Sequence, residues 1–193
     1  MRTLIILTFL LQSVISIGQK NYQIEKVFWS YTKPQNYKIR VDNFSSAIRA
    51  GDSLINKNNK LEKQASTDNI LFAFSKNDSI DINIIMADYK SNSNIVKYTL
   101  KGYIDKLVDF MKSNFAKMGS DAKISTKEVF IDKIKFYVLE SKIVHKEKNY
   151  TYWTEMYITE LSKKELTIAV AYDNEKDKKI LVESISRSRF TTK

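Results

Sequence analysis

The chain has 193 residues, with 32 Lys and Arg against 22 Asp and Glu, one histidine and no cysteine. The lack of cysteine excludes disulfides, thiol catalysis, thiolate metal sites and a lipid anchor on cysteine. The net charge of +10 predicts weak long-range attraction to anionic surfaces, although the lysines are spread over predicted turns and helix ends, which is typical of solvated surface.

The N-terminal 18 residues are predicted to be a cleaved secretory signal peptide. A basic residue precedes an apolar run from Leu4 to Leu11. The small residues Ser16 and Gly18 suit the −3 and −1 positions of a cleavage site before Gln19. The apolar run is too short for a membrane span, which needs roughly 20 residues, and no later segment is apolar enough for one. The alternative is an N-terminal helix that stays on the protein, either amphipathic or buried.

Cleavage would release residues 19–193 as one domain, because a chain of this length is typical of a single folded unit. A cysteine-free exported domain rich in Lys, Asn and Ile is typical of bacteria. We therefore expect a periplasmic or secreted bacterial protein.

The first half of the chain predicts short strands joined by turns. Pro34, the only proline, marks a turn between two of them. Residues 45–61 are ambiguous between helix and loop, because Gly51 weakens the partial helical spacing. Alternation of apolar and polar residues predicts strands over 27–31, 37–41, 70–74 and 80–86, the last two as a hairpin.

The second half of the chain predicts a long helix, four strands and a final helix. Apolar residues at three- and four-residue intervals predict a helix over 99–118, with Thr99 as N-cap and Gly119 just past its end. A second amphipathic helix is predicted over 175–188, with its cap at Asp173 to Glu175. Strands are predicted over 124–131, 135–144, 150–161 and 166–172.

Short turns between the strands imply antiparallel neighbours, because parallel strands need long crossovers. The sequence therefore predicts an α+β fold: an antiparallel sheet of about six to eight strands, with two amphipathic helices covering it as an α/β/α sandwich.

This layout resembles the PsbP-like superfamily, which includes the photosystem II extrinsic P protein and the nuclear Ran-release factor. The matching features are the strand, proline and strand over 31–39, the long helix before a strand meander, and the closing helix from Ile180 to Phe190 with its final aromatic residue. The resemblance covers about residues 24–190. It implies a non-enzymatic role, because known members are mostly binding or assembly proteins, but a shared fold does not by itself fix a function.

The chain has no motif for a known catalytic or cofactor site. His145 is the only histidine, and it falls at a strand end beside a lysine-rich turn, where an exposed or half-packed residue is expected. No nucleophile elbow, calcium loop, phosphate-binding glycine loop or dinucleotide fingerprint is present. We therefore expect no metal and no cofactor.

One constellation of polar residues is predicted on the hairpin of 135–144 and 150–161. A two-residue turn at Glu147 and Lys148 would pair each residue i with residue 295 − i. This register sets one carboxylate opposite another, which is unfavourable in a sheet unless a cation compensates. Lys142 could neutralise the pair or stack on an aromatic ring. The predicted ligand patch consists of Glu140, Lys142, Trp153, Glu155 and Tyr157.

The patch has two interpretations. A carboxylate pair such as Glu140 and Glu155 is what acid/base chemistry on glycosides requires, which would make the protein an extracytoplasmic hydrolase or lyase. The alternative is a salt-bridged, partly exposed sheet face without chemistry.

We expect an exported, non-catalytic domain that binds another protein or an envelope component, with the hydrolase or lyase as the alternative. Electrostatic binding to anionic polymers or lipids is a third interpretation. Nucleic acid is disfavoured, because most aromatic residues fall on core positions rather than on an exposed platform.

Overall fold

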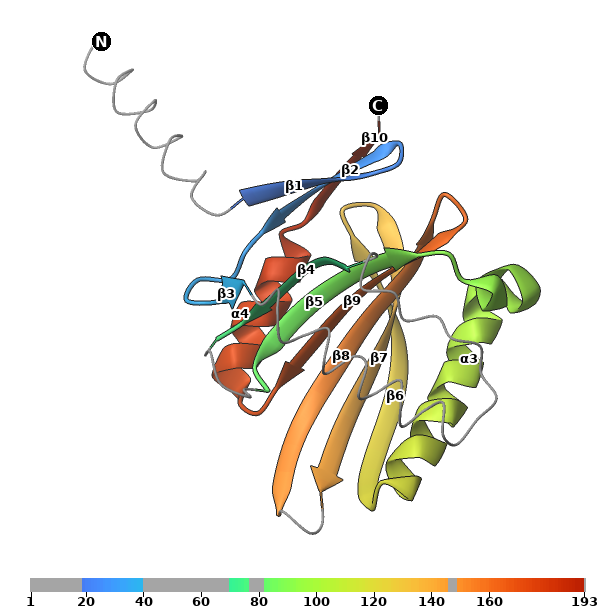
Figure 1. The fold of residues 1–193 in the computed structure, drawn as a ribbon, viewed down its shortest axis with the longest axis vertical. Helices are drawn as coiled ribbons and strands as arrows, with labels where there is room; N and C mark the ends of the chain where they lie inside the picture. The colour runs from blue at the N-terminus through green and yellow to red at the C-terminus, as the bar shows by residue number, and fades with distance from the viewer. Residues whose placement is uncertain (1–18, 40–69, 77–81, 146–148, 193) are drawn as a thin grey trace.

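The computed structural model describes residues 19–39, 70–76, 82–145 and 149–192. Within them, seven antiparallel strands form one sheet in the order β3-β4-β5-β9-β8-β7-β6, and three strands form a second sheet in the order β1-β2-β10 (Figure 1). The strands are β1 Gln19–Ile24, β2 Val27–Thr32, β3 Lys38–Ile39, β4 Ile70–Ser75, β5 Ile84–Lys90, β6 Ser120–Ile131, β7 Ile134–His145, β8 Tyr150–Leu161, β9 Lys164–Tyr172 and β10 Arg189–Thr192. The helices are α3 Ser93–Lys117 and α4 Glu175–Ser186.

The regular part of the large sheet is the meander of β6 to β9. Its first and last hairpins turn on two residues each, and all four turn residues have positive φ, as the turns that match strand twist require. The β6–β7 turn consists of Asp132 and Lys133, and the β8–β9 turn of Ser162 and Lys163. Such tight turns fix the register of every pair that follows them.

The two helices cover opposite faces of the large sheet. Along β7, Val138 belongs to the core that contains Leu181 and Ile185 of α4, while the next residue, Leu139, belongs to the core that contains Ile104 of α3. Alternate side chains of a strand point to opposite faces. The predicted α/β/α arrangement is therefore present, and Figure 1 shows α3 alongside β6 and α4 at the other side of the sheet.

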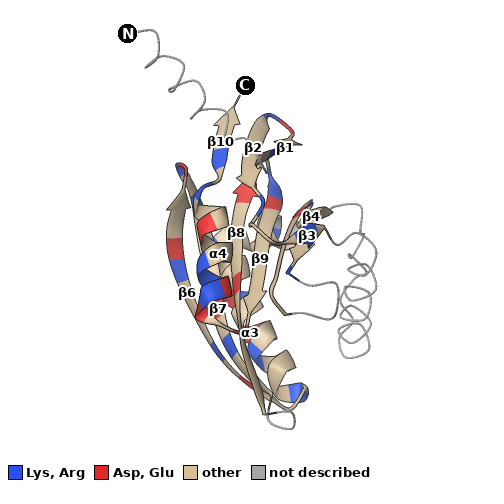
Figure 2. Ribbon diagram, turned by 90° about the vertical axis from the view of Figure 1, so that its left-hand side faces the viewer, with Lys and Arg blue, Asp and Glu red and all other residues tan. Residues whose placement is uncertain are grey.

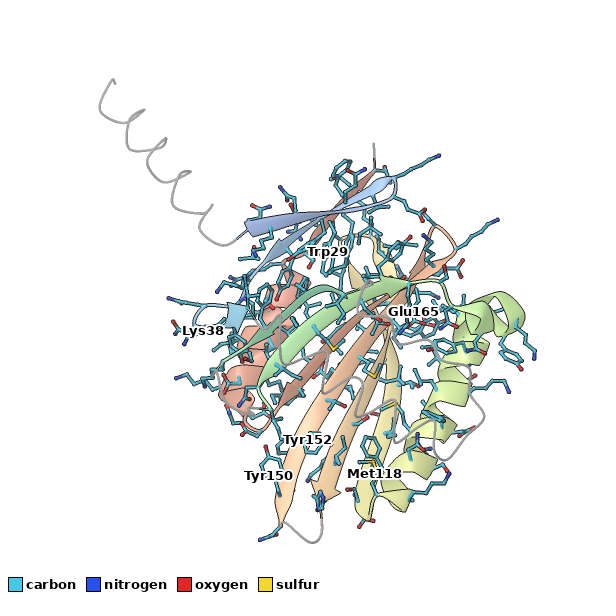
Figure 3. All side chains as sticks on the ribbon, viewed as in Figure 1. Trp29, Lys38, Met118, Tyr150, Tyr152 and Glu165 are labelled. Carbon is cyan, nitrogen blue, oxygen red and sulfur yellow. The ribbon has the colours of Figure 1, made fainter. Side chains whose placement is uncertain are left out.

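The three-stranded sheet, called the small sheet below, packs on the same face of the large sheet as α4. Trp29 of β2 is fully buried beneath it and packs against the rings of Phe72 and Phe190 (Figure 3). The Asp132 side chain accepts a hydrogen bond of 2.7 Å from the backbone nitrogen of Phe190, which joins the β6–β7 turn to β10.

The start of α4 is held by a buried carboxylate. Asn174 caps the helix, and Asp177 accepts hydrogen bonds from Lys76, Asn174 and Tyr37. Asp177 is completely buried. Burial alone would raise the pKa of Asp177, but these donors, with Lys76 first, more than offset it, and the pKa lies below the ordinary value. This network fixes α4 against β4 and the chain before β3.

The predicted α+β class, the antiparallel sheet and most elements are confirmed. Three predicted starts are wrong. The strand predicted over 124–131 is β6 at Ser120–Ile131. The strand predicted over 80–86 is β5 at Ile84–Lys90, because residues 82 and 83 precede the ladder. The long helix begins at Ser93 rather than at Thr99, since Asn92 provides an earlier N-cap.

Thr99 nevertheless interrupts α3. Its φ of 65° and ψ of 160° are non-helical, and its side-chain oxygen accepts a hydrogen bond from the nitrogen of Gly102 at 3.4 Å. Thr99 therefore caps the second segment of the helix, as the sequence predicted. Gly119 has the predicted positive φ just after the helix end.

Several predictions fall outside the described residues, namely the leader of residues 1–18, the ambiguous segment 45–61 and the turn at Glu147 and Lys148. Strands β1 and β10 were not predicted. Among the described residues, no helix combines the length and apolar character that crossing a membrane requires.

Candidate functional site

The predicted register of the β7–β8 hairpin is correct. Glu140 lies directly opposite Glu155, and Lys142 lies directly opposite Trp153, as the sum of 295 requires. Tyr157 lies two residues after Glu155 on the same face of β8. The fold therefore brings all five residues of the predicted patch together on the face that α4 partly covers.

The centre of this surface is the buried carboxylate of Glu155. Its side chain is only 3% exposed, and each of its oxygens accepts a tyrosine hydroxyl. Tyr157 donates to Oε2 at 2.6 Å and Tyr172 of β9 donates to Oε1 at 2.8 Å. Hydrogen bonds to a charged acceptor are among the stronger ones in proteins. We call Glu155, Tyr157 and Tyr172 the carboxylate–tyrosine cluster.

The two tyrosines of this cluster are held protonated. Burial raises the pKa of both hydroxyls well above the ordinary tyrosine value, and the adjacent Glu155 carboxylate raises it further. Tyr157 and Tyr172 are therefore permanent donors at neutral pH, which suits the stabilisation of a carboxylate rather than proton transfer.

The second predicted carboxylate is compensated by a lysine that the sequence reasoning missed. Lys127 of β6 donates a hydrogen bond of 2.6 Å to Glu140. Both side chains are substantially exposed, so the ion pair is screened by water. Glu140 is therefore paired with Lys127 of β6, whereas Glu155 is stabilised by the hydroxyls of Tyr157 on β8 and Tyr172 on β9.

Lys142 contacts an aromatic ring, which is one of the two roles that the sequence predicted for it. Its ammonium lies 5.8 Å from the centre of the Trp153 ring. The same ring stacks on Tyr172 at 6.3 Å with an interplanar angle of 7°, and Lys178 of α4 lies 5.9 Å from the Tyr172 ring. The four side chains form one row across the surface, which we call the cation–aromatic row.

A hollow of about 530 Å³ opens between α4 and strands β6 to β8. Its base includes the carboxylate–tyrosine cluster, and its sides carry charges of both signs from α4 and β6, which Figure 2 shows as neighbouring blue and red segments. Lys142 and Trp153 lie beside the hollow rather than in it. The lining residues are Lys127, Glu140, Glu155, Tyr157, Glu175, Lys178, Lys179, Val182 and Glu183.

The helix side of the hollow could not be derived from the sequence, because no local pattern places α4 over a particular strand. The positions of Tyr172 and Lys127 at the site could have been predicted from the sequence. The turn at Ser162 and Lys163 pairs Tyr172 with Trp153, and the turn at Asp132 and Lys133 brings Lys127 diagonal to Glu140.

The geometry of the two carboxylates is poorly suited to acid/base catalysis. Glu155 is buried with both oxygens occupied, so it presents no accessible proton acceptor, and Glu140 is engaged with Lys127. A general acid or base must reach the proton that it transfers. The described residues also contain no group of three or more metal-ligating side chains.

The only histidine lies apart from the hollow. His145 ends β7, opposite Ser120 of β6 and Tyr150 of β8, and it is half-buried. Its Nδ1 is buried, and within the described residues it has no hydrogen-bond partner. Figure 3 shows Tyr150 at the lower end of β8.

Another buried carboxylate, on the face of the large sheet opposite to Glu155, was not predicted from the sequence. Glu165 of β9 is 3% exposed and accepts hydrogen bonds from Asn92, the cap of α3, and from Thr167 at 2.7 Å. Asp88 is paired with Lys90 at 2.8 Å nearby. Figure 3 shows Glu165 near the start of α3. This network attaches the first turn of the helix to the sheet.

No protein-family model matches the chain, and no curated protein matches it in sequence. The resemblance to the PsbP-like superfamily therefore stays a prediction from element order.

Proposed function

We propose that this protein is an exported, non-catalytic domain that binds a component of the cell envelope, and that the hollow between α4 and β6 to β8 is its ligand site. The observation that supports this proposal most strongly is the state of Glu155, whose two oxygens both accept tyrosine hydroxyls in a buried position.

The hollow has the properties of a binding site for a polar ligand. Lys127, Lys178 and Lys179 offer donors, while Glu140 and Glu183 offer acceptors, around one opening. Such mixed polar groups fix the orientation of a ligand in a concave site. Beneath them, the hydroxyls of Tyr157 and Tyr172 stay protonated at neutral pH and remain hydrogen-bond donors to Glu155, because the pKa of each is raised by burial.

The hydrolase or lyase alternative is disfavoured by the same geometry. Catalysis on a glycoside needs one carboxyl group that donates a proton and a second that attacks or activates water. Glu155 lies below the surface, and its oxygens are directed at Tyr157 and Tyr172.

The proposal is tested with the full-length chain carrying its own leader, expressed in a bacterium and recovered from the periplasm and medium. We expect an N-terminus at Gln19, retention on isolated envelope fractions, and no shortening of envelope polysaccharides measured by size-exclusion chromatography. The variants Glu140→Gln and Glu155→Gln are the controls for catalysis. Shortening of a polymer by the wild type that Glu155→Gln abolishes, or failure of the wild type to be retained on any envelope fraction, would contradict the proposal.

A further inference from the structure

Two lysines face each other across the edge of the large sheet. Lys123 of β6 and Lys142 of β7 are directly opposite in the register and point to the same face as Glu140. Both are exposed. Like charges directly opposite each other destabilise a sheet, so this pair has a cost in the ligand-free protein.

Two neighbouring lysines on this surface, Lys127 and Lys178, have carboxylate partners. Lys127 pairs with Glu140 at 2.6 Å, and Lys178 approaches Glu175 at 3.8 Å. Within the described part of the chain, neither Lys123 nor Lys142 has a carboxylate at ion-pair distance. Lys142 instead contacts an aromatic ring, with its ammonium 5.8 Å from the centre of the Trp153 ring.

The contact with Trp153 keeps the Lys142 ammonium on the sheet face. Trp153 is itself stacked on the buried Tyr172, so the ring is fixed in place. This contact orders the Lys142 side chain on the face that it shares with Lys123, so less side-chain freedom is lost when an anion arrives.

We infer that Lys123 and Lys142 together bind a carboxylate or phosphate group of an anionic polysaccharide, whose chain continues past Trp153 into the hollow. This inference rests on the proposed function and names the class of its ligand. A single anionic group between the two ammonium groups removes the unfavourable like-charge contact.

The charges around the pair favour a polysaccharide over a membrane. A membrane surface is negative everywhere, and it would bring its charge against Glu140, Glu175 and Glu183 of the same surface. A polysaccharide has isolated anionic groups separated by hydroxyls, which can donate to these carboxylates.

The test uses the full-length protein and three substituted forms. The first carries Lys123→Gln and Lys142→Gln, and the matched control carries Lys112→Gln and Lys117→Gln. The control removes the same charge from exposed positions of α3, on the other face of the sheet. The third form, Lys123→Gln alone, removes the like charge opposite Lys142 and keeps the contact of Lys142 with Trp153, so its melting temperature without ligand reports on the like-charge pair.

Calorimetric titrations use oligogalacturonate and dextran phosphate as anionic probes, with fully methyl-esterified oligogalacturonate and dextran as neutral counterparts. Monomeric galacturonate, inorganic phosphate and phosphatidylglycerol vesicles distinguish the other sources of the same anionic groups. We expect binding to at least one anionic polymer and not to its neutral counterpart. The Lys123 and Lys142 double variant should bind about tenfold more weakly, because two partly exposed ion pairs are lost, whereas the control should change affinity less than about twofold. We also expect Lys123→Gln to melt at a higher temperature than the wild type, because it removes the like charge opposite Lys142.

An equal loss of affinity in the two double variants would overturn the inference. Equal affinity for the monomers and the polymers, or binding to the vesicles alone, would also overturn it. Retention on envelope fractions with no binding to either anionic polymer would overturn this inference and leave the proposed function standing. Failure to bind any envelope fraction would overturn both.

Discussion

The hydroxyl of Tyr172 on β9 donates a hydrogen bond of 2.8 Å to the carboxylate of Glu155 on β8. This contact occupies one of the two oxygens with which Glu155 could otherwise accept a proton. Together with the hydroxyl of Tyr157 it holds the carboxylate beneath the hollow, where Glu155 has no ion pair within the described part of the chain. The same tyrosine ring supports Trp153, so one side chain links the buried carboxylate to the cation–aromatic row.

The first prediction concerns the hydroxyls of this cluster. Tyr172→Phe should lower the free energy of unfolding by about 1.5–3 kcal/mol, because it removes a hydrogen bond to a buried charged group. Tyr157→Phe should cost a similar amount, and urea unfolding at pH 7 measures both. In the background of Glu155→Gln the cost of each substitution should fall, and an unchanged cost there would show that the charge of Glu155 does not matter.

The second prediction concerns the carboxylate that holds the start of α4. The pKa of Asp177 is lowered in the folded state from an ordinary value of 3.8. Asp177 therefore stabilises the fold above about pH 4, and this contribution is lost as the pH falls through the folded-state pKa. Asp177→Asn should cost about 1 kcal/mol at pH 7, a modest figure because Lys76 is partly exposed. The cost should diminish in acid, and a cost that stays constant between pH 7 and pH 3 would contradict the assignment.

The third prediction concerns Asp88 of β5, whose pKa is shifted in the opposite direction to that of Asp177. Burial raises the pKa of Asp88 above 3.8, Lys90 offsets this only in part, and Glu165 adds to it. The ionised form is therefore disfavoured in the folded state at pH values above the folded-state pKa, and the penalty disappears as the pH falls toward 3.8. The stability of Asp88→Asn relative to the wild type should be greater at pH 7 than at pH 4. Urea unfolding at both values measures it, and the reverse order would contradict the prediction.

The fourth prediction concerns the interruption of α3. Thr99 has φ 65° and ψ 160°, a backbone region that is occupied almost only by glycine. Thr99→Gly should raise the free energy of unfolding by about 1–2 kcal/mol, since it relieves strain and a glycine cap is nearly as good. Thr99→Ala keeps the strain and loses the cap, so it should destabilise. Thermal unfolding of the two variants in parallel provides the comparison.

The part of the site that lies on β7 and β8 was predictable because a turn of known length fixes a register. The pairs formed by Glu140 with Glu155 and by Lys142 with Trp153 follow from the predicted pairing sum of 295. Lys123 opposite Lys142 follows from the adjacent turn at Asp132 in the same way.

The remainder of the fold and site depends on interactions between distant segments. Strand β1 has mostly polar residues with exposed side chains, so its sequence has little of the apolar alternation that indicates a strand. Strand β10 is only four residues long and is held by tertiary contacts such as the one between Asp132 and Phe190. The position of α4 over the hollow depends on the fit of Leu181 and Ile185 to the sheet, which local patterns do not encode.

The most direct test of the proposed ligand site uses the two tryptophans of the chain as reporters. The full-length protein is labelled with 5-fluorotryptophan, its two fluorine resonances are assigned with Trp29→Phe and Trp153→Phe, and the binding envelope fraction or polymer is added. Trp153 lies beside the hollow, whereas Trp29 is fully buried under the small sheet. Binding at the hollow predicts that the Trp153 resonance moves with saturation while the Trp29 resonance stays in place. Bound ligand that leaves Trp153 unmoved, or that moves Trp29 instead, would place the binding surface elsewhere.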